Sequence, residues 1–149
     1  MGYCTIEDLN NFVKKDFLIN KARRDEDVAE EYIERIQKSI EDATVEIDGY
    51  LSSKYQIPLQ VVPGHIKNKC ADIAIYYIVS ASGIAKDSEE YSFIEKYNKA
   101  IKYLETVRDS EKDILNINNT GEQKPIVQSS PFLKNIENKD FNKKFWKGF

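Results

Sequence analysis

The chain has 149 residues, of which 41% are hydrophobic and 32% are charged, which favours one folded domain over a two-domain enzyme or a disordered chain. Lysine and arginine number 22 against 25 aspartates and glutamates, so the net charge is −3. The chain as a whole therefore lacks the positive field with which DNA-binding domains attract phosphate.

The first predicted elements are two amphipathic helices. Thr5, followed three residues later by Asp8, resembles a capping box that opens a short helix. Apolar residues then recur in steps of three and four, which predicts a long helix over residues 27–55. Asp48 falls off the apolar stripe and is interpreted as solvated. Gly49 lies inside this helix and suggests a close backbone approach to another element.

A proline-rich connection leads to a third helix that is apolar nearly all round. Pro58 and Pro63 indicate an extended segment over residues 56–62. Helical spacing follows over residues 66–81, and Gly83 ends it. Because most faces of this helix are apolar, it must be covered either by its own domain or by a neighbouring subunit.

The last predicted helix carries an apolar stripe from Tyr91 to Val107 and can be capped by Asp87 or Ser88. The fold class is therefore all-α, a small helical bundle with a short N-terminal helix and three longer ones. We predict a helical core over residues 1–115 and an extended C-terminal arm over residues 116–149, where periodicity is lost and prolines and polar residues are frequent.

The end of this arm combines aromatic and basic side chains. We expect its interface residues to be Phe132, Phe141, Phe145, Trp146, Phe149, Lys143, Lys144 and Lys147. Five lysines against two acidic residues give residues 134–149 a charge of +3, which leaves −6 on the other 133 residues. Aromatic anchors beside lysines favour docking into apolar pockets of an acidic protein partner, such as another copy of this chain. Stacking on single-stranded nucleic acid is the alternative.

The chain offers few residues for metal, disulfide or catalytic chemistry. Cys4 and Cys70 lack the paired spacing of a zinc site, and a disulfide framework is equally unsupported. His65 has no partner in a catalytic motif and is interpreted as structural or solvent-facing. Acidic runs at residues 25–27 and 41–42 differ from an EF-hand loop, so a solvated helix face is the simpler interpretation than a metal-dependent enzyme. We expect no catalytic residue, cofactor or metal.

The sequence does not begin with a basic region followed by an apolar run, so we expect no signal peptide. The most apolar stretch, residues 71–81, is shorter than the roughly 20 residues that a membrane span needs. We interpret it as a buried helix of a protein made in the cytoplasm.

Four segments occur in an order that matches a known family: YCTIEDL at 3–9, ATVEIDGYL at 43–51, KYQIPL at 54–59 and CADIAIY at 70–76. Together they resemble the Mu-type head-to-tail connector proteins of tailed phages, also called adaptor or head-completion proteins. The block from 46 to 59 is the most specific of them, although a plain helix end followed by a proline connection would use the same residue types. The motif residues are Glu46, Ile47, Asp48, Gly49, Tyr50, Leu51, Tyr55, Pro58, Leu59 and Asp72.

The resemblance implies a structural virion protein without catalytic activity. It implies a ring, commonly of twelve copies, that joins the portal protein of the DNA-filled head to a tail-side stopper or tail-completion protein. DNA would pass through the channel without sequence-specific binding, and the protein would lie in the virion at the head-to-tail junction after assembly in the host cytoplasm. An acidic body suits such a channel because it repels phosphate. The alternative function is a small helical regulatory module that binds nucleic acid through the arm.

Overall fold

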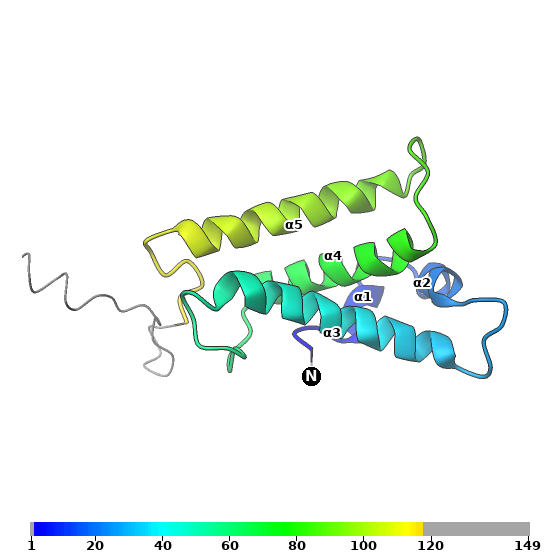
Figure 1. Ribbon diagram of the computed structural model, residues 1–149, viewed down its shortest axis with the longest axis horizontal. Helices are drawn as coiled ribbons and strands as arrows, with labels where there is room; N and C mark the ends of the chain where they lie inside the picture. Colours follow the sequence, from blue (N-terminus) through cyan, green and yellow to red (C-terminus); the bar gives the residue numbers. More distant parts are fainter. Residues whose placement is uncertain (1, 118–149) are drawn as a thin grey trace, which may run out of the picture.

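The computed structural model describes residues 2–117, and this part of the chain is helical with no strand (Figure 1). Its helices are α1 (Ile6–Asn10), α2 (Lys15–Ala22), α3 (Glu31–Leu51), α4 (Gly64–Ala81) and α5 (Tyr91–Asp109). The predicted all-α bundle is therefore confirmed. None of these helices is long and apolar enough to cross a membrane.

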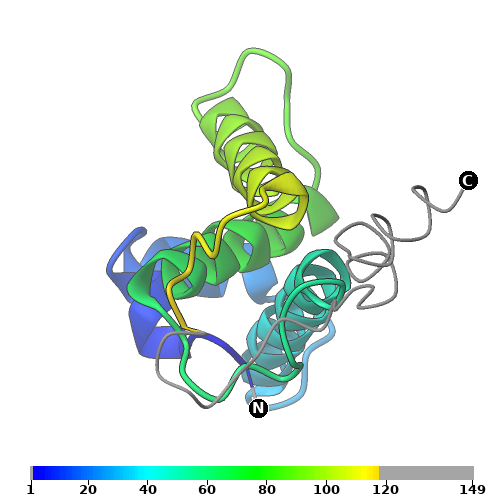
Figure 2. The same ribbon diagram turned by 90° about the vertical axis from the view of Figure 1, so that its left-hand side faces the viewer.

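Helix α4 is the centre of the bundle and contacts each of the other four helices. Figures 1 and 2 show α3, α4 and α5 running in alternating directions, with α1 and α2 beside α4. The predicted apolar helix is thus covered mainly by its own domain. Its buried residues are Ile66, Cys70, Ala71, Ile73, Ala74, Ile75, Ile78 and Val79.

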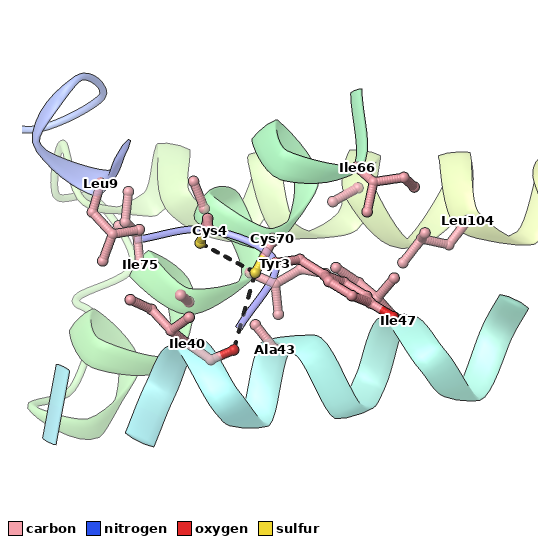
Figure 3. Packing of buried hydrophobic residues seen from close by; sticks show 14 of the residues in the cluster. Tyr3, Cys4, Leu9, Ile40, Ala43, Ile47, Ile66, Cys70, Ile75 and Leu104 are labelled. Atoms are coloured by element: carbon pink, nitrogen blue, oxygen red, sulfur yellow. Dashed lines mark hydrogen bonds between the residues drawn. The ribbon is translucent and has the colours of Figure 1, made fainter. Parts of the chain in front are cut away.

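The core lies where α3 crosses α4 and the N-terminal segment. Ile40, Ala43 and Ile47 on α3 have no exposed surface. They face the N-terminal residues and α4 (Figure 3). The apolar stripe predicted for this helix therefore forms one wall of the core, as its spacing of three and four requires.

Local sequence signals set the start of α1 and the end of α4. The Asp8 amide donates to Thr5 Oγ1 at 3.2 Å, and the Thr5 amide donates to Asp8 Oδ2 at 2.8 Å, which confirms the capping box. Gly83 follows α4 with a φ of +90°, a conformation that glycine adopts readily. The prediction that α4 ends at Gly83 is therefore confirmed to within two residues.

The capping expected for α5 is wrong. Its N-cap is Glu90, whose side chain makes no capping hydrogen bond. Ser88 Oγ instead donates to the Ala85 carbonyl at 2.9 Å, and the Ser88 carbonyl accepts from the Tyr91 amide at 3.0 Å. Backbone turns before the helix therefore take the place of a side-chain cap.

Helix α2 was not predicted from the sequence. Phe17, Leu18 and Ile19 are consecutive, and successive residues of a helix are about 100° apart, so they point in three directions. Leu18 is buried in the core, while the Phe17 ring stacks on Phe93 of α5 with centroids 5.6 Å apart. A helix that uses several faces leaves no one-sided apolar stripe for periodicity to detect.

Helix α3 is shorter than the predicted range of 27–55. Ala29 has a φ of 59°, which an α-helix cannot contain, and Asp27 Oδ2 accepts from the Arg24 amide at 2.9 Å to close a turn. The same carboxylate pairs with Arg35. This turn holds residues 24–30 outside the helix, which begins at Glu31.

The close backbone approach expected at Gly49 is wrong. A Cβ at this exposed position would meet nothing within 4 Å. The close approach is instead at Gly2, where a Cβ would collide with the Ile40 side chain of α3. The N-terminal segment therefore lies against α3 more tightly than a residue with a side chain would allow.

Candidate functional site

Residues 46–59, called the motif segment below, form the end of α3 and the start of its connection to α4. Ile47, Leu51 and Tyr55 have no exposed surface, and Leu59 is 6% exposed. Pro58 follows Ile57 through a cis peptide bond. The motif segment is thus part of the core, and its polar side chains connect the core to other elements.

Glu46 joins the three long helices. Its carboxylate accepts hydrogen bonds from the Tyr77 hydroxyl of α4 and, at 2.8 Å, from the Tyr97 hydroxyl of α5. Tyr97 also stacks on Tyr76, with ring centroids 4.1 Å apart. Burial, and then the hydrogen bond to Glu46, raise the pKa of both phenols above their usual value. Both tyrosines therefore stay protonated and donate to Glu46.

Asp48 fastens the N-terminal segment, so its interpretation as a solvated residue is wrong. The Tyr3 hydroxyl donates to Asp48 and accepts from the Leu59 amide at 2.9 Å. The Tyr3 amide donates to Thr44 Oγ1 at 3.0 Å. Burial raises the pKa of Asp48, and the Tyr3 hydrogen bond opposes that rise. Tyr3 thus connects α3 with the segment that leads to α4.

Tyr55 and Lys54 hold the residues that follow α5. The Tyr55 hydroxyl donates to Asp113 Oδ1 at 2.6 Å and accepts from the Leu115 amide at 3.4 Å. Lys54 Nζ donates to backbone carbonyls after α5 and, at 3.2 Å, to the Val107 carbonyl. The motif segment therefore fixes the point from which the chain continues toward residue 118.

The remaining motif residues lie nearer the surface. Tyr50 is half-buried, with the Arg108 guanidinium 5.5 Å from the centre of its ring. Asp72 is half-buried on α4, where burial raises the pKa of its carboxyl while Lys69 and Lys96 oppose the rise. Each of these two residues therefore has a basic neighbour on α5, Arg108 for Tyr50 and Lys96 for Asp72.

The candidates for metal chemistry are not brought together in the described part of the chain. Asp27 pairs with Arg35, whose hydrogen bonds lower the pKa of Asp27 to about 2. His65 is exposed at the start of α4, with its ring centroid 6.4 Å from that of Tyr103. No group of three or more histidine, cysteine or acidic side chains within residues 2–117 is placed to hold a metal ion.

Two grooves flank α2, and each is lined by both apolar and polar side chains. The first, called the α1–α3 groove, has a volume of about 440 Å³, and its apolar lining comes from α1, α2 and α3 and includes Ile6, Ile19, Tyr32 and Ile33. Asn10 also lines it, and its Oδ1 atom is buried without a hydrogen-bond partner in the described residues. The other, called the α2–α5 groove, measures about 520 Å³ and contains the stacked Phe17 and Phe93 rings.

The family model described as "Bacteriophage Mu, Gp36" matches residues 3–130. The chain belongs to the bacteriophage Mu Gp36 family. It is 30% identical to "Gene product J" of Escherichia phage Mu over 110 residues, which cover 70% of this chain and 74% of that protein. It is also 32% identical to "Mu-like prophage FluMu protein gp36" of Haemophilus influenzae over 73 residues, 49% of this chain and 48% of the relative.

Membership of the Gp36 family makes the chain a Mu-type phage protein and indicates a structural or assembly role. The matched range includes all five helices that lie within residues 2–117 and the whole motif segment. The resemblance found in the sequence is thus confirmed at the level of a Mu-type phage protein.

The predicted arm residues lie outside the described part of the chain. These are Phe132, Phe141, Phe145, Trp146, Phe149, Lys143, Lys144 and Lys147. Within the described part, sequence reasoning missed both grooves, because each includes residues of the unpredicted helix α2. The run of Phe17, Leu18 and Ile19 was the available signal, since three large apolar residues in succession seldom face solvent together.

Sequence reasoning also missed the contact between Cys4 and Cys70. Their sulfur atoms are 3.1 Å apart in the core, and both cysteines are free. Separation along the chain gave no indication of this contact, because only the packing of the N-terminal segment on α4 brings them together.

Proposed function

We propose that this Gp36-family protein is a head-to-tail connector, whose copies assemble into a ring between the portal and the tail and let DNA pass. It acts through protein contacts and without catalysis. The observation that supports this most directly is the pair of separate grooves on either side of α2, which are lined by different residues. A closed ring of identical copies requires two different complementary surfaces on each copy, because every contact is heterologous.

The occupant that we propose for the α1–α3 groove is the C-terminal segment of a neighbouring copy. Residues 118–149 follow a described part whose last residues, Leu115 and Ile117, are buried beside the motif segment. At about 3.3 Å per extended residue, this length of chain can reach up to about 100 Å. A neighbouring copy is therefore within reach of the arm.

The chemistry of the segment fits the groove. Residues 134–149 carry +3 and the rest of the chain carries −6, so the arm of one copy is attracted to the body of another. Ile19 and Ile33 offer apolar contacts for the aromatic side chains. The buried Asn10 Oδ1 offers an acceptor for a donor such as the indole N–H of Trp146, because a buried indole N–H needs a partner.

Passage of DNA is consistent with the charge of the body. A net charge of −6 over residues 1–133 repels phosphate, whereas a basic lining would hold DNA through many contacts. The same charge disfavours the regulatory nucleic-acid-binding module. That alternative would rely on the lysines and aromatic residues of the arm alone.

Light scattering on the full chain mixed with its portal protein tests the proposal. We expect a complex that contains many copies of the chain for each portal. Ile33→Lys places a positive charge in the groove, where it repels the basic arm, and should weaken assembly at least tenfold. Val45→Lys is the matched control, because Val45 is 68% exposed on the same helix and lines neither groove.

The outcomes separate the competing functions. Equal assembly by the two variants would contradict the proposed use of the α1–α3 groove. A chain that ignores the portal but binds single-stranded DNA, with strong salt dependence and only when residues 134–149 are present, would support the regulatory module instead.

A further inference from the structure

The two cysteines of the chain meet inside the core. Cys4 Sγ lies 3.1 Å from Cys70 Sγ, and the residues are 4% and 0% exposed. Cys4 belongs to the N-terminal segment before α1, while Cys70 is on α4. Figure 3 shows the two sulfur atoms facing each other beside Ile40 and Ala43. Neither the proposed connector function nor family membership assigns a role to this contact.

We propose that Cys4 and Cys70 form a disulfide site that responds to a peroxide oxidant and fastens the N-terminal segment to α4. A disulfide joins sulfur atoms about 2.0 Å apart, so the two atoms must approach by only about 1 Å. Cys70 is held within a regular helix, whereas Cys4 precedes α1 and is part of a non-helical segment. The approach therefore requires a small shift of residues 2–5 and no rearrangement of the bundle.

The surroundings of Cys70 favour it as the attacking thiolate. Thr44 Oγ1 lies 3.7 Å from its sulfur, and the Cys4 thiol donates to it. The hydrogen bond from Cys4 is the main cause that lowers the pKa of Cys70, although burial opposes it. The Thr44 hydroxyl donates to the Ile40 carbonyl at 2.9 Å. A thiolate is the reactive form of cysteine, so the hydrogen bond from Cys4 supports reaction at Cys70 first.

The reaction balances with hydrogen peroxide as the oxidant. The Cys70 thiolate attacks one peroxide oxygen, the O–O bond breaks, and a sulfenic acid forms while hydroxide leaves and takes a proton to become water. The Cys4 sulfur then attacks the Cys70 sulfur, the S–O bond breaks, and a second water carries away the Cys4 proton. Two thiols and one peroxide thus give one disulfide and two waters.

We expect the disulfide between Cys4 and Cys70 to restrict the movement of the motif segment. Tyr3 precedes Cys4 directly and holds Asp48 and the Leu59 amide through its hydroxyl. A bond from Cys4 to α4 therefore keeps Tyr3 in place. Closing a loop of this length should raise the melting temperature by about 10 °C, because the unfolded chain loses freedom.

The test uses the purified full chain without portal, so its result is independent of the connector proposal. After treatment with a few equivalents of hydrogen peroxide, we expect loss of both free thiols, a mass decrease of two hydrogen atoms and a higher melting temperature that a reductant reverses. Cys4→Ala should show no such rise. If Cys4→Ala fails to fold, Cys70→Ala supplies the same control, and the mass and thiol measurements on the unchanged chain decide by themselves.

Two results would overturn the proposal. One is that both thiols stay reduced in the folded chain under conditions that oxidise them in the unfolded chain. The other is that oxidation links separate chains into dimers on a non-reducing gel, with no internal disulfide in the monomer.

Discussion

At the scale of single residues, Glu46 and Asp48 connect α3 to other parts of the chain through hydrogen bonds. They lie two positions apart on α3, and each accepts a hydrogen bond from a tyrosine on another part of the chain. Hydrogen bonds to a charged group are worth about 1.5–3 kcal/mol each, more than most surface contacts. These two motif residues therefore stabilise the arrangement of the helices and the position of the N-terminal segment.

Glu46→Gln should destabilise the bundle. Tyr77 and Tyr97 donate to different carboxylate oxygens, and glutamine replaces one of these oxygens with an NH2 donor, so one tyrosine loses its present acceptor and both bonds become weaker without the charge. We expect the free energy of unfolding to fall by about 1–3 kcal/mol. Urea unfolding followed by circular dichroism measures this change, and Glu41→Gln, exposed on the same helix, is the control. Equal stabilities of the two variants would show that the shared carboxylate is unimportant.

Asp27 predicts a pH dependence with a definite sign. Its pKa is lowered from 3.8 to about 2 in the folded chain, mainly by Arg35. A carboxyl whose folded pKa is depressed stabilises the fold above its unfolded pKa and loses that contribution as the pH falls toward the folded value. The stability difference between the unchanged chain and Asp27→Asn should therefore be constant above about pH 5 and shrink between pH 4 and pH 2. A difference that grows on acidification would contradict this pairing.

Residue roles were predicted from the sequence only where the partners are local. The capping box of Thr5 and Asp8 spans three positions and was found. The partners of Glu46 lie 31 and 51 positions away, so helical spacing could not reveal them. The close approach predicted at Gly49 was wrong for the same reason, because a glycine alone does not show whether another element lies near it.

At the scale of elements, α2 is the helix that contributes residues both to the core and to the two grooves. Leu18 anchors it in the core at 1% exposure, while Phe17 and Ile19 line the two grooves. Helices α3, α4 and α5 were predictable because their apolar residues recur with helical spacing. Helix α2 was not predictable, because its apolar residues face three different directions. The start of α3 was not predictable either, because it depends on a turn that is held by the contact between Asp27 and Arg35.

Leu18→Ala should loosen α2 and weaken the fold. Removing a fully buried leucine side chain costs about 2–5 kcal/mol, because apolar contacts are lost and a cavity remains. Asn20→Ala, at an exposed position of the same helix, should change stability by less than about 0.5 kcal/mol. Thermal or urea unfolding compares the two. A Leu18 variant as stable as the Asn20 variant would mean that α2 does not belong to the core.

At the scale of the whole molecule, the described helices bury a core among themselves. Within residues 2–117 this core includes Leu115 and Ile117, and α4 is covered by helices of its own domain. The sequence left open whether a neighbouring subunit covers α4, because periodicity shows that a face is apolar but not what lies against it. Under the proposed function, the grooves beside α2 are the surfaces of the described residues that we expect to bind partners.

Removal of residues 134–149 should separate folding from assembly. Because residues 2–117 bury a core of their own, we expect the truncated chain to keep its helical circular-dichroism spectrum and to unfold cooperatively. Its assembly with the portal should weaken, since the aromatic and basic anchors are gone. Assembly at full strength after truncation would refute the role of the arm.

Electron microscopy of the full chain bound to its portal tests the connector account most directly. The account predicts a closed ring of copies on the portal, with the C-terminal residues of each copy seated in the α1–α3 groove of its neighbour. A chain that remains monomeric in the presence of the portal would contradict it.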